Sequence, residues 1–335
     1  MPHDVQGEVT LADLGESGVL ARVFPLLPQP DATLVGPGDD AAVVAAPDGR
    51  VVVTTDQMVE GGDWRAEWSG GYDVGWKAAA QNLADIAGMG AVPTALVVSL
   101  TAPPSTPVAW VERLAEGLAA ACNGTGAGVV GGDLSAGERI VVTVTALGDL
   151  QGRPPVLRSG ATVGDSVALA GRVGWSAAGL ELLRARRGDI APHLVAAHLR
   201  PEPPYDAGPA AATGGATALL DVSDGLLRDA GRIADASGVT LDLDVAALRA
   251  DSAALEDAAD GMADRALALR WVLTGGEDHP LLATFPPGPV PAPYRTIGAV
   301  VARGDGPVLA DGRPPAELIG EVTGWDHFEP DRPQT

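Results

Sequence analysis

The sequence ATALLDVSDGLLRDAGRIADASGVTLDL, residues 216–243, places a strand, a helix and a second strand in immediate succession. Residues 216–221 and 240–243 are short runs rich in apolar side chains, which predicts strands. Residues 226–237 carry apolar side chains at helical spacing and begin directly after Gly225. Strands and helices that alternate in this way are typical of α/β and α+β proteins.

The same alternation extends along the chain. In the first half we expect a β-hairpin of residues 41–46 and 51–55 around Pro47-Asp48-Gly49-Arg50, helices at 74–89 and 107–122, and strands at 95–100, 128–130 and 140–147. In the second half we expect strands at 166–170, 281–285 and 296–301, and helices at 175–187, 192–199 and 206–213. Residues 151–162 are rich in Pro, Gly and Arg, which predicts a linker between domains of residues 1–150 and 151–335.

The composition is that of a globular protein with a core of small side chains. Apolar residues make up 46% of the chain and aromatic residues 4%, so Ala, Val and Leu must supply the core. The formal net charge is −22. Such a surface repels nucleic acids and anionic membranes, which excludes both as partners. A site for anionic phosphates would need metal cations to become locally positive.

The N-terminus and the single cysteine bear on the compartment. Residues 1–18 carry four acidic side chains and lack the apolar core of a secretory signal, and the chain has no long apolar run. We therefore expect a cytoplasmic protein. Cys122 lies in an apolar stretch and is the only cysteine, so we expect a buried, unreactive thiol.

Carboxylates recur where apolar runs meet Gly, Ser or Thr. They are Asp39, Asp40, Asp56, Asp133, Asp221, Asp224, Glu277 and Asp278, together with Asp85 on the predicted helix 74–89. A strand end is a rigid place for a ligand, and an adjacent glycine lets a phosphate approach the backbone. Gathered carboxylates repel one another, and Mg²⁺, which prefers oxygen ligands, relieves that repulsion. A turn or helix cap is the alternative for any single carboxylate, but the whole pattern favours a metal site.

Familiar phosphate-binding and zinc-binding motifs are missing from the sequence. Lys77 is the only lysine and follows Trp76, so there is no P-loop. The strand lysine, helix glutamate and His-Arg-Asp loop of protein kinases are missing as well. His193 and His198 are five residues apart, which is not the spacing of a helical zinc pair, so we interpret both as solvated helix positions.

Eight motifs occur in an order and spacing that resemble bacterial thiamine-monophosphate kinases over essentially the whole chain. They are Gly38-Asp39-Asp40-Ala41-Ala42, Thr54-Thr55-Asp56, the segment from Lys77 to Pro93, Gly131-Gly132-Asp133, Arg158-Ser159-Gly160-Ala161, Asp221-Val222-Ser223-Asp224-Gly225-Leu226, Gly275-Gly276-Glu277-Asp278 and Gly324-Trp325-Asp326-His327-Phe328. The resemblance implies a two-domain α/β (α+β) fold of the aminoimidazole ribonucleotide synthetase type. Residues 1–150 would then bind ATP and Mg²⁺ and pair in a homodimer, and residues 151–335 would complete the nucleotide and substrate site.

The resemblance also implies a role for each matching residue. The implied Mg²⁺ ligands are Asp40, Thr54, Thr55, Asp56, Asp85, Asp133, Asp221 and Asp224, of which Asp56 and Asp133 would act in catalysis through the metal. The implied ATP contacts are Gly132, Asp133, Arg158 and Ser223, and the implied substrate contacts are Glu277 and Trp325. Lys77 matches a family lysine, for which we expect a phosphate contact, with a surface pair to Asp73 as the alternative.

One position departs from the family pattern. A histidine that meets the substrate commonly follows the Thr-Thr-Asp motif, whereas this chain has Gly61-Gly62-Asp63-Trp64. We interpret Asp63 as a contact for the cationic thiazolium ring of the substrate, with Trp64 as an aromatic face beside it. Membership of the metal shell, or an exposed turn without substrate contact, are the alternatives for Asp63.

The implied reaction is in-line attack by a phosphate oxygen of thiamine monophosphate on the γ-phosphorus of ATP. Both reactants are anions, so charge neutralisation by several Mg²⁺ ions and alignment are the main tasks. A terminal phosphate is mostly ionised near neutral pH, with a second pKa of about 6, so no general base is required.

Related enzymes and a silent binding protein are the alternatives. Selenophosphate synthetase would have a reactive cysteine near its N-terminus and the hydrogenase-maturation ATPase one at its C-terminus, and this sequence has neither. A catalytically silent thiamine-phosphate-binding protein is the other alternative, and the retained set of metal-binding aspartates argues against it.

Overall fold

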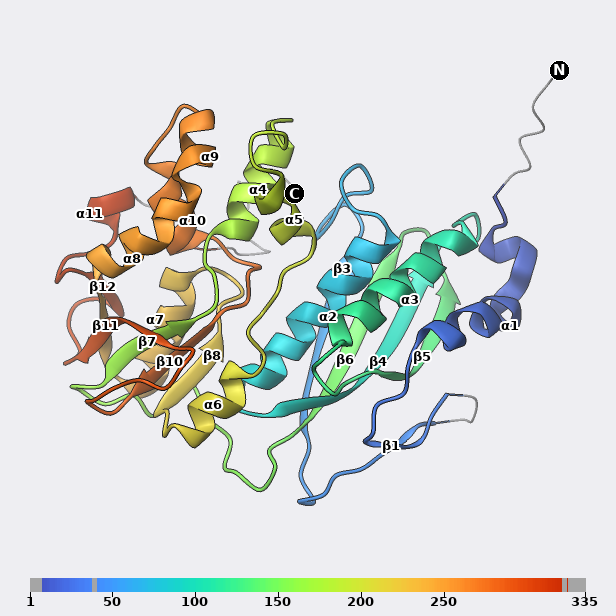
Figure 1. The fold of residues 1–335 in the computed structure, drawn as a ribbon, viewed down its shortest axis with the longest axis horizontal. Coiled ribbons are helices and arrows are strands. Elements are labelled where there is room, and N and C mark those ends of the chain that lie inside the picture. Colours follow the sequence, from blue (N-terminus) through green and yellow to red (C-terminus); the bar gives the residue numbers. More distant parts are fainter. Residues whose placement is uncertain (1–7, 38–40, 321–323, 325–335) are drawn as a thin grey trace.

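The computed structural model describes residues 8–37, 41–320 and 324. Two large β-sheets lie side by side, each with helices packed on it, and the chain completes the first before it begins the second (Figure 1). We call the first sheet and its helices the N-terminal unit and the second sheet and its helices the C-terminal unit. Of the described helices, none is both long and apolar enough to cross a membrane.

The N-terminal unit contains a four-stranded sheet in the order β3-β6-β4-β5, counted over the described residues. Its strands are β3 (Val52–Val59), β4 (Val92–Ala102), β5 (Val129–Ala136) and β6 (Val141–Asp149). β4 and β5 are parallel, and the other neighbours are antiparallel. The helices α2 (Gly71–Gly88) and α3 (Val108–Cys122) lie side by side across one face, and α1 (Leu11–Val23) and the 3-10 helix η1 (Phe24–Leu26) pack against α3 (Figure 1).

The two faces of this sheet differ because successive side chains of a strand point to opposite sides. On the helix side, Val142, Val144 and Ala146 of β6 are fully buried. On the other side, Val53 of β3 is 61% exposed and Val97 of β4 is 38% exposed. The second face is therefore open to solvent in the single chain, and we call it the open face.

The C-terminal unit contains a six-stranded sheet in the order β12-β9-β11-β7-β10-β8, again over the described residues. Its strands are β7 (Ser166–Ala170), β8 (Ala218–Asp221), β9 (Thr240–Leu243), β10 (Leu281–Phe285), β11 (Arg295–Val301) and β12 (Val308–Ala310). Its helices are α4 (Trp175–Arg184), α5 (Pro192–Leu199), α6 (Ala207–Thr213), α7 (Leu226–Ser237), α8 (Val245–Ser252), η2 (Ala253–Leu255), α9 (Glu256–Gly261), α10 (Leu267–Thr274) and α11 (Ala316–Ile319). One face packs on α4, α7, α8 and α10, and the other on α6 and the end of α2, so both faces are covered.

Helix α2 is shared by the two units. It packs on the first sheet, and its C-terminal end contacts β8 and α6. Gly208 of α6 permits this approach, because a Cβ atom there would lie 2.2 Å from the carbonyl oxygen of Ala87. Side chains on α2 are therefore positioned to face residues of the C-terminal unit.

Most of the predicted elements are found, and one pairing is wrong. Residues 41–46 and 51–55 do not form a hairpin: β2 (Val43–Val44) pairs with β1 (Thr33–Val35), and β3 pairs with β6. β3 gains a ladder along its whole length, from Val52 opposite Gly148 to Val59 opposite Val141. A two-residue strand offers far less cross-strand pairing, so the long-range partner is preferred. Cys122 is buried as expected, and burial raises the pKa of its thiol to about 12.

Candidate active site

Three of the predicted carboxylates meet where α2 passes from the first sheet to the second. Thr54 and Asp56 project from β3 toward α2, because they alternate with the residues of the open face. The Thr54 hydroxyl donates to Asp85 Oδ2 of α2 at 2.8 Å. Asn82, one turn earlier on α2, accepts from the Asp56 backbone N–H at 3.1 Å and donates to the Ala78 carbonyl at 2.9 Å.

The electrostatics place Asp221, at the end of β8, in the same group. Burial raises the pKa of Asp85 to about 7, with the charges of Asp221 and Asp56 adding to the shift. Burial also raises the pKa of Asp56, and the charges of Asp221 and Asp224 raise it further. These charges act on one another because the carboxylates lie in the same buried region. We call Asp56, Asp85 and Asp221 the junction carboxylates.

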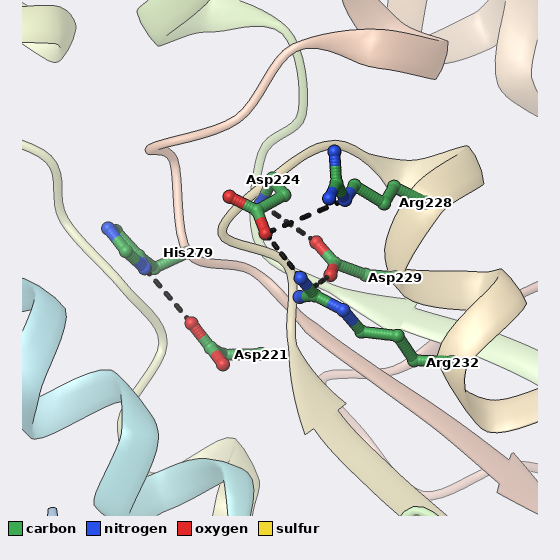
Figure 2. Close-up of polar contacts among 6 residues, drawn as sticks. All are labelled: Asp221, Asp224, Arg228, Asp229, Arg232 and His279. Carbon is green, nitrogen blue, oxygen red and sulfur yellow. Dashed lines mark hydrogen bonds and ion pairs between the residues drawn. The ribbon is translucent and has the colours of Figure 1, made fainter. Parts of the chain in front are cut away.

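A buried histidine that the sequence did not single out lies against this group. His279 Nδ1 is 3.0 Å from Asp221 Oδ2, and both side chains are nearly inaccessible (Figure 2). Burial lowers the pKa of His279, but the hydrogen bond to Asp221 and the nearby negative charges outweigh it and raise the pKa above its ordinary value. His279 therefore supplies part of the positive charge that the junction carboxylates require.

Asp224 belongs to a second network, on the other side of the same loop. Its carboxylate takes an ion pair from Arg232 at 2.5 Å and a longer one from Arg228 at 3.9 Å (Figure 2). The fully buried Asp229 accepts from the Asp224 backbone N–H at 2.9 Å and also pairs with Arg232. Asp224 is thus held by an arginine and a buried carboxylate, both from α7.

The loop 275–279 lies directly on the loop that carries Asp221 and Asp224. The Glu277 N–H donates to the Ser223 carbonyl at 2.9 Å. Gly276 makes this contact possible, because a Cβ atom there would lie 2.1 Å from the Ser223 carbonyl oxygen. Glu277 and His279 both have left-handed backbone angles, with φ of 66° and 51°. Such angles are unfavourable for residues other than glycine and persist only where the surroundings hold them.

Glu277 is held by residues of two helices. Its Oε1 lies 2.7 Å from Nζ of Lys77 on α2, and its Oε2 lies 3.5 Å from Nδ1 of His198 on α5. Burial raises the pKa of Glu277, but the charges of Lys77 and His198 more than compensate and bring it to about 2. Burial and the Lys77 charge lower the pKa of His198 to about 3, so its ring is neutral at physiological pH.

These contacts correct two expectations from the sequence. His198 is buried rather than solvated, because Ser176 lies 3.0 Å from its Nδ1 and Glu277 of the 275–279 loop lies 3.5 Å from the same atom. Lys77 is not a surface residue paired with Asp73, since it is only 4% exposed and pairs with Glu277. Asp73 instead pairs with Arg200 at 3.7 Å.

Asp278 has a structural position next to this site. Its Oδ1 accepts from the Ser176 N–H at 2.8 Å, at the first turn of α4. Burial raises the pKa of Asp278 to about 7 despite this hydrogen bond. Three consecutive side chains, at 277, 278 and 279, therefore fasten one loop to three different elements.

Gly132 and Asp133 lie apart from the junction carboxylates. Asp56 is in register with Val144, Val144 with Val98, and Val98 with Gly132, so β3 and β5 are three strand spacings apart, or about 14 Å. Asp133 also projects to the open face, next to Ser135, whose hydroxyl donates to it at 2.8 Å. Gly132 and Asp133 line an apolar cavity of about 100 Å³ together with Pro37, which precedes the undescribed segment 38–40.

The other predicted residues fall in several places. The Thr55 hydroxyl is on the open face, where it donates to the Val144 carbonyl at 3.0 Å. Ser223 lies between Asp221 and Asp224, and Arg158 is exposed on the segment beside β8. Asp40 and Trp325 lie outside the described residues.

Asp63 has a partner within its own turn. Its Oδ2 accepts from the Val59 N–H at 2.7 Å. The neighbouring Trp64 ring is 5% exposed and stacks on Trp110 at a centroid distance of 5.8 Å. The ring therefore belongs to the core of the N-terminal unit and not to a surface that a ligand reaches.

The donor set fits Mg²⁺ that also binds phosphates. Over the described part of the chain, no three His, Cys, Asp or Glu side chains come close enough to hold a metal ion by themselves. Mg²⁺ in nucleotide sites does not require this, because it takes one or two carboxylates and completes its shell with phosphate oxygens and water. The raised pKa of Asp85 indicates an excess of negative charge, which a cation would relieve.

Comparison with known proteins gives the family. Residues 38–150 match the family described as AIR synthase related protein, N-terminal domain. The thiamine-monophosphate kinase of Mycobacterium tuberculosis (strain ATCC 25618 / H37Rv) is 51% identical over 325 residues, which cover 96% of this chain and 94% of the relative. The chain belongs to the thiamine-monophosphate kinase family.

Solved structures of this kinase family share the fold. Thiamine-monophosphate kinase from Stenotrophomonas maltophilia K279a superposes with a TM-score of 0.73 at 29% identity, over 89% of this chain and 95% of that one. A structure described as AaThiL complexed with AMPPCP and TMP gives a TM-score of 0.71 at 31% identity, over 96% of this chain and 99% of that one. The expected α/β fold of the aminoimidazole ribonucleotide synthetase type is thereby confirmed, and the chain is a kinase.

Several residues of this kinase site escaped the sequence analysis. They are Asn82, His198, Asp229, Arg232 and His279. The sequence of α2 gives one indication, because Lys77 and Asp85 are eight residues apart and therefore lie on the same side of a helix. The remaining contacts join residues far apart in the chain, which no local spacing indicates.

Proposed function

We propose that this kinase transfers the γ-phosphoryl group of ATP directly to thiamine monophosphate and so forms thiamine diphosphate. The observation that carries the proposal is the buried group of junction carboxylates, which repel one another and lie at the meeting of the two units. In a chain with a net charge of −22, these carboxylates would repel an anionic substrate unless cations were bound together with it. The relative solved with AMPPCP and TMP supports both substrates.

The residues proposed to hold Mg²⁺ fall into two sets. One set lies at the junction and comprises Thr54, Asp56, Asp85, Asp221 and Asp224. The other comprises Thr55 and Asp133 on the open face, and Asp40, which is also a proposed ligand, lies outside the described residues. When bound, Mg²⁺ neutralises phosphate oxygens of both reactants, which is the main requirement for transfer between two anions.

The chain's own groups orient the reactants and need not move a proton. The acceptor phosphate is mostly ionised near neutral pH, with a second pKa of about 6. His198 is neutral and engaged with Ser176, and His279 is engaged with Asp221, so neither is needed as a general base. Gly132, Arg158 and Ser223 are the proposed ATP contacts, and Glu277, Trp325 and Asp63 the proposed substrate contacts. Glu277 stays ionised at all physiological pH values, which suits the cationic ring of thiamine monophosphate.

We further propose a homodimer that pairs the open faces. Val53 and Val97 would be covered in it, and apolar side chains on an open sheet face are stabilised by a partner. In such a dimer Asp133 of one chain would face the open face of its partner, which carries Thr55, whereas the junction carboxylates lie on the other face of each sheet, toward α2. Within one chain Asp133 and Asp56 lie three strands apart, whereas Thr55 lies between Thr54 and Asp56 on β3 and projects to the opposite face.

The division into domains follows the two sheets. β6 ends at Asp149 and β7 begins at Ser166, so residues 1–150 and 151–335 are proposed as the domains. Of the proposed Mg²⁺ ligands, Asp221 and Asp224 then come from the second domain and the others from the first, as does Lys77.

A coupled assay of ADP release tests the proposed reaction. ADP and thiamine diphosphate should form only when ATP, Mg²⁺ and thiamine monophosphate are all present, and Asp56→Asn should abolish both. Thiamine monophosphate binding without ADP release would instead identify a silent binding protein, and ADP release driven by another acceptor would assign a different substrate.

A further inference from the structure

The single lysine of this chain makes a buried ion pair across the junction of the two units. Lys77 lies on α2, is 4% exposed, and places Nζ 2.7 Å from Oε1 of Glu277. All other basic side chains apart from histidine are arginines. Because a buried amine must be paired to remain charged, this position depends on Glu277.

The second carboxylate oxygen of Glu277 is constrained as well. His198 Nδ1 lies 3.5 Å from Oε2 and 3.0 Å from the Ser176 hydroxyl. Because the His198 imidazole is neutral and is held by Ser176, it packs against the Glu277 carboxylate and restricts its orientation without neutralising its charge. The Glu277 carboxylate is therefore paired with the Lys77 cation through one oxygen and lies against the neutral His198 ring through the other.

The backbone conformation of Glu277 is unfavourable, which indicates that contacts with its surroundings maintain it. Its φ of 66° is unfavourable for a residue with a side chain. The N–H to the Ser223 carbonyl, at 2.9 Å, fixes the same residue from the side of the C-terminal unit. Backbone and side chain together point the Glu277 carboxylate, which remains 38% exposed, toward the junction.

We propose that Lys77 and His198 are positioning residues that hold the Glu277 carboxylate in the orientation that receives the cationic end of thiamine monophosphate. This inference rests on the proposed function, in which Glu277 contacts that substrate. A compact ammonium on a flexible stem suits the buried position, whereas the larger planar guanidinium of arginine would displace its neighbours.

Single variants at three positions test this inference. In Lys77→Met, the KM for thiamine monophosphate should rise by about tenfold, with the KM for ATP changed by less than about twofold, because only substrate binding is lost. Glu277→Gln should give the same pattern. His198→Asn should give a smaller rise in the same KM. Lys77→Arg should recover only part of the loss.

The double variant separates positioning from a general structural role. If Lys77 acts through Glu277, Lys77→Met combined with Glu277→Gln should have the KM for thiamine monophosphate of Glu277→Gln alone. Arg200→Met is a matched control, because it removes another ion pair that joins α2 to the C-terminal unit, with Asp73 at 3.7 Å. Its KM values should match those of the unmodified chain.

Calorimetric titration with thiamine monophosphate, without ATP, gives a second readout. Weakened binding in Lys77→Met, with unchanged binding of an ATP analogue, supports the inference. Additive effects in the double variant, or equal losses for both substrates, would overturn it and leave a purely structural ion pair. Failure of the unmodified chain to use thiamine monophosphate would overturn the proposed function instead, and the two failures are thus distinguishable.

Discussion

Two groups of acidic side chains at the junction of the units meet opposite electrostatic surroundings. Asp56 and Asp85 are buried beside Asp221, and the pKa of Asp85 rises to about 7. Glu277, on a neighbouring loop, faces Lys77 and has a pKa of about 2. The first group lacks enough positive charge within the chain, whereas the second is already neutralised. The difference is what the proposed function requires, in which the junction carboxylates bind Mg²⁺ and Glu277, oriented by Lys77, contacts the substrate.

Keeping unneutralised carboxylates together lowers the stability of the folded chain. An acid whose pKa is raised on folding binds protons more tightly in the native state, so stability decreases as pH rises between the unfolded and folded pKa values. Functional sites commonly carry such a cost, because the arrangement that serves the transition state is not the most stable one. Removing a junction carboxylate should therefore impair activity and stabilise the fold.

The largest effect is expected for Asp85→Asn. Turnover should fall by about a thousandfold, since a carboxylate proposed to hold Mg²⁺ is lost. The free energy of unfolding should rise above that of the unmodified chain by on the order of 1 to 3 kcal/mol at pH 8 and by much less at pH 4, because the cost of Asp85 develops between pH 4 and about 7. Steady-state kinetics and urea unfolding at both pH values measure this.

The exposed Asp305→Asn is the control for Asp85→Asn, with both quantities unchanged. Normal turnover of Asp85→Asn at saturating Mg²⁺ would remove Asp85 from the metal-binding residues. Lower stability at pH 8 would show that its charge is compensated in the native chain.

The second effect tests whether one site draws on two chains. Asp133→Asn should also lose most of its turnover, yet without a change in stability, since Asp133 is exposed on the open face. If one active site requires Asp85 of one chain and Asp133 of its partner, a mixture of Asp85→Asn and Asp133→Asn chains should regain about a quarter of normal activity. Half of randomly mixed dimers are then hybrids, and each hybrid has one intact site.

Mixing the two inactive chains after mild dissociation, followed by the ADP-release assay, measures the recovery. Two chains that both carry Asp85→Asn serve as the control. If the mixture stays inactive although hybrid dimers are detected, each site is built within one chain.

The sequence specifies the elements of this fold better than their partners. Local spacing locates α2, α7 and most strands, because side-chain periodicity depends only on which face is buried. The hairpin at 41–55 fails because turn residues at 47–50 are present while the stronger ladder for β3 lies some 90 residues away on β6. The helices α8 to α10 are short and were not expected, since few apolar positions mark each one.

The candidate site divides in the same way. Asp56, Asp85, Asp221 and Asp224 were predicted as metal-binding residues and lie at the junction. That Asp133 lies on a different face could not be predicted, because register and strand order decide it. The pairs formed by Lys77 with Glu277 and His279 with Asp221 join elements that are distant in sequence. Their chemistry is visible in the sequence, but their contacts depend on packing.

A third, smaller effect concerns the pH dependence of stability and His198, which contacts Glu277. The pKa of His198 falls from 6.5 to about 3 because its ring is buried, so the native chain binds fewer protons than the unfolded chain between these values. The stability that neutral His198 confers is present above pH 6.5 and decreases as pH falls. Between pH 7 and pH 5 the loss should be about 2 kcal/mol. Urea unfolding across this range should show a weaker pH dependence in His198→Asn, and an unchanged dependence would contradict the buried, neutral state.

The smallest effect is expected at Asp63, which belongs neither to the junction carboxylates nor to the Lys77–Glu277 pair. Its Oδ2 accepts from the Val59 N–H at 2.7 Å, as the cap of its own turn. Asp63→Ala should therefore lower the free energy of unfolding by about 1 kcal/mol. As a proposed contact for the thiazolium ring, the same change should raise the KM for thiamine monophosphate by about tenfold or less with kcat unchanged.

Asp63→Asn separates the two contributions, because an amide oxygen still accepts the hydrogen bond whereas the charge is gone. If Asp63 attracts the cationic ring, the Asn variant should show the raised KM of the Ala variant together with the stability of the unmodified chain. If KM stays normal in both variants, Asp63 is a turn residue, which agrees with the burial of Trp64 beside it. A large fall in kcat would instead place the carboxylate among the metal-binding residues. Its hydrogen bond from the Val59 N–H would then have to break when the metal binds.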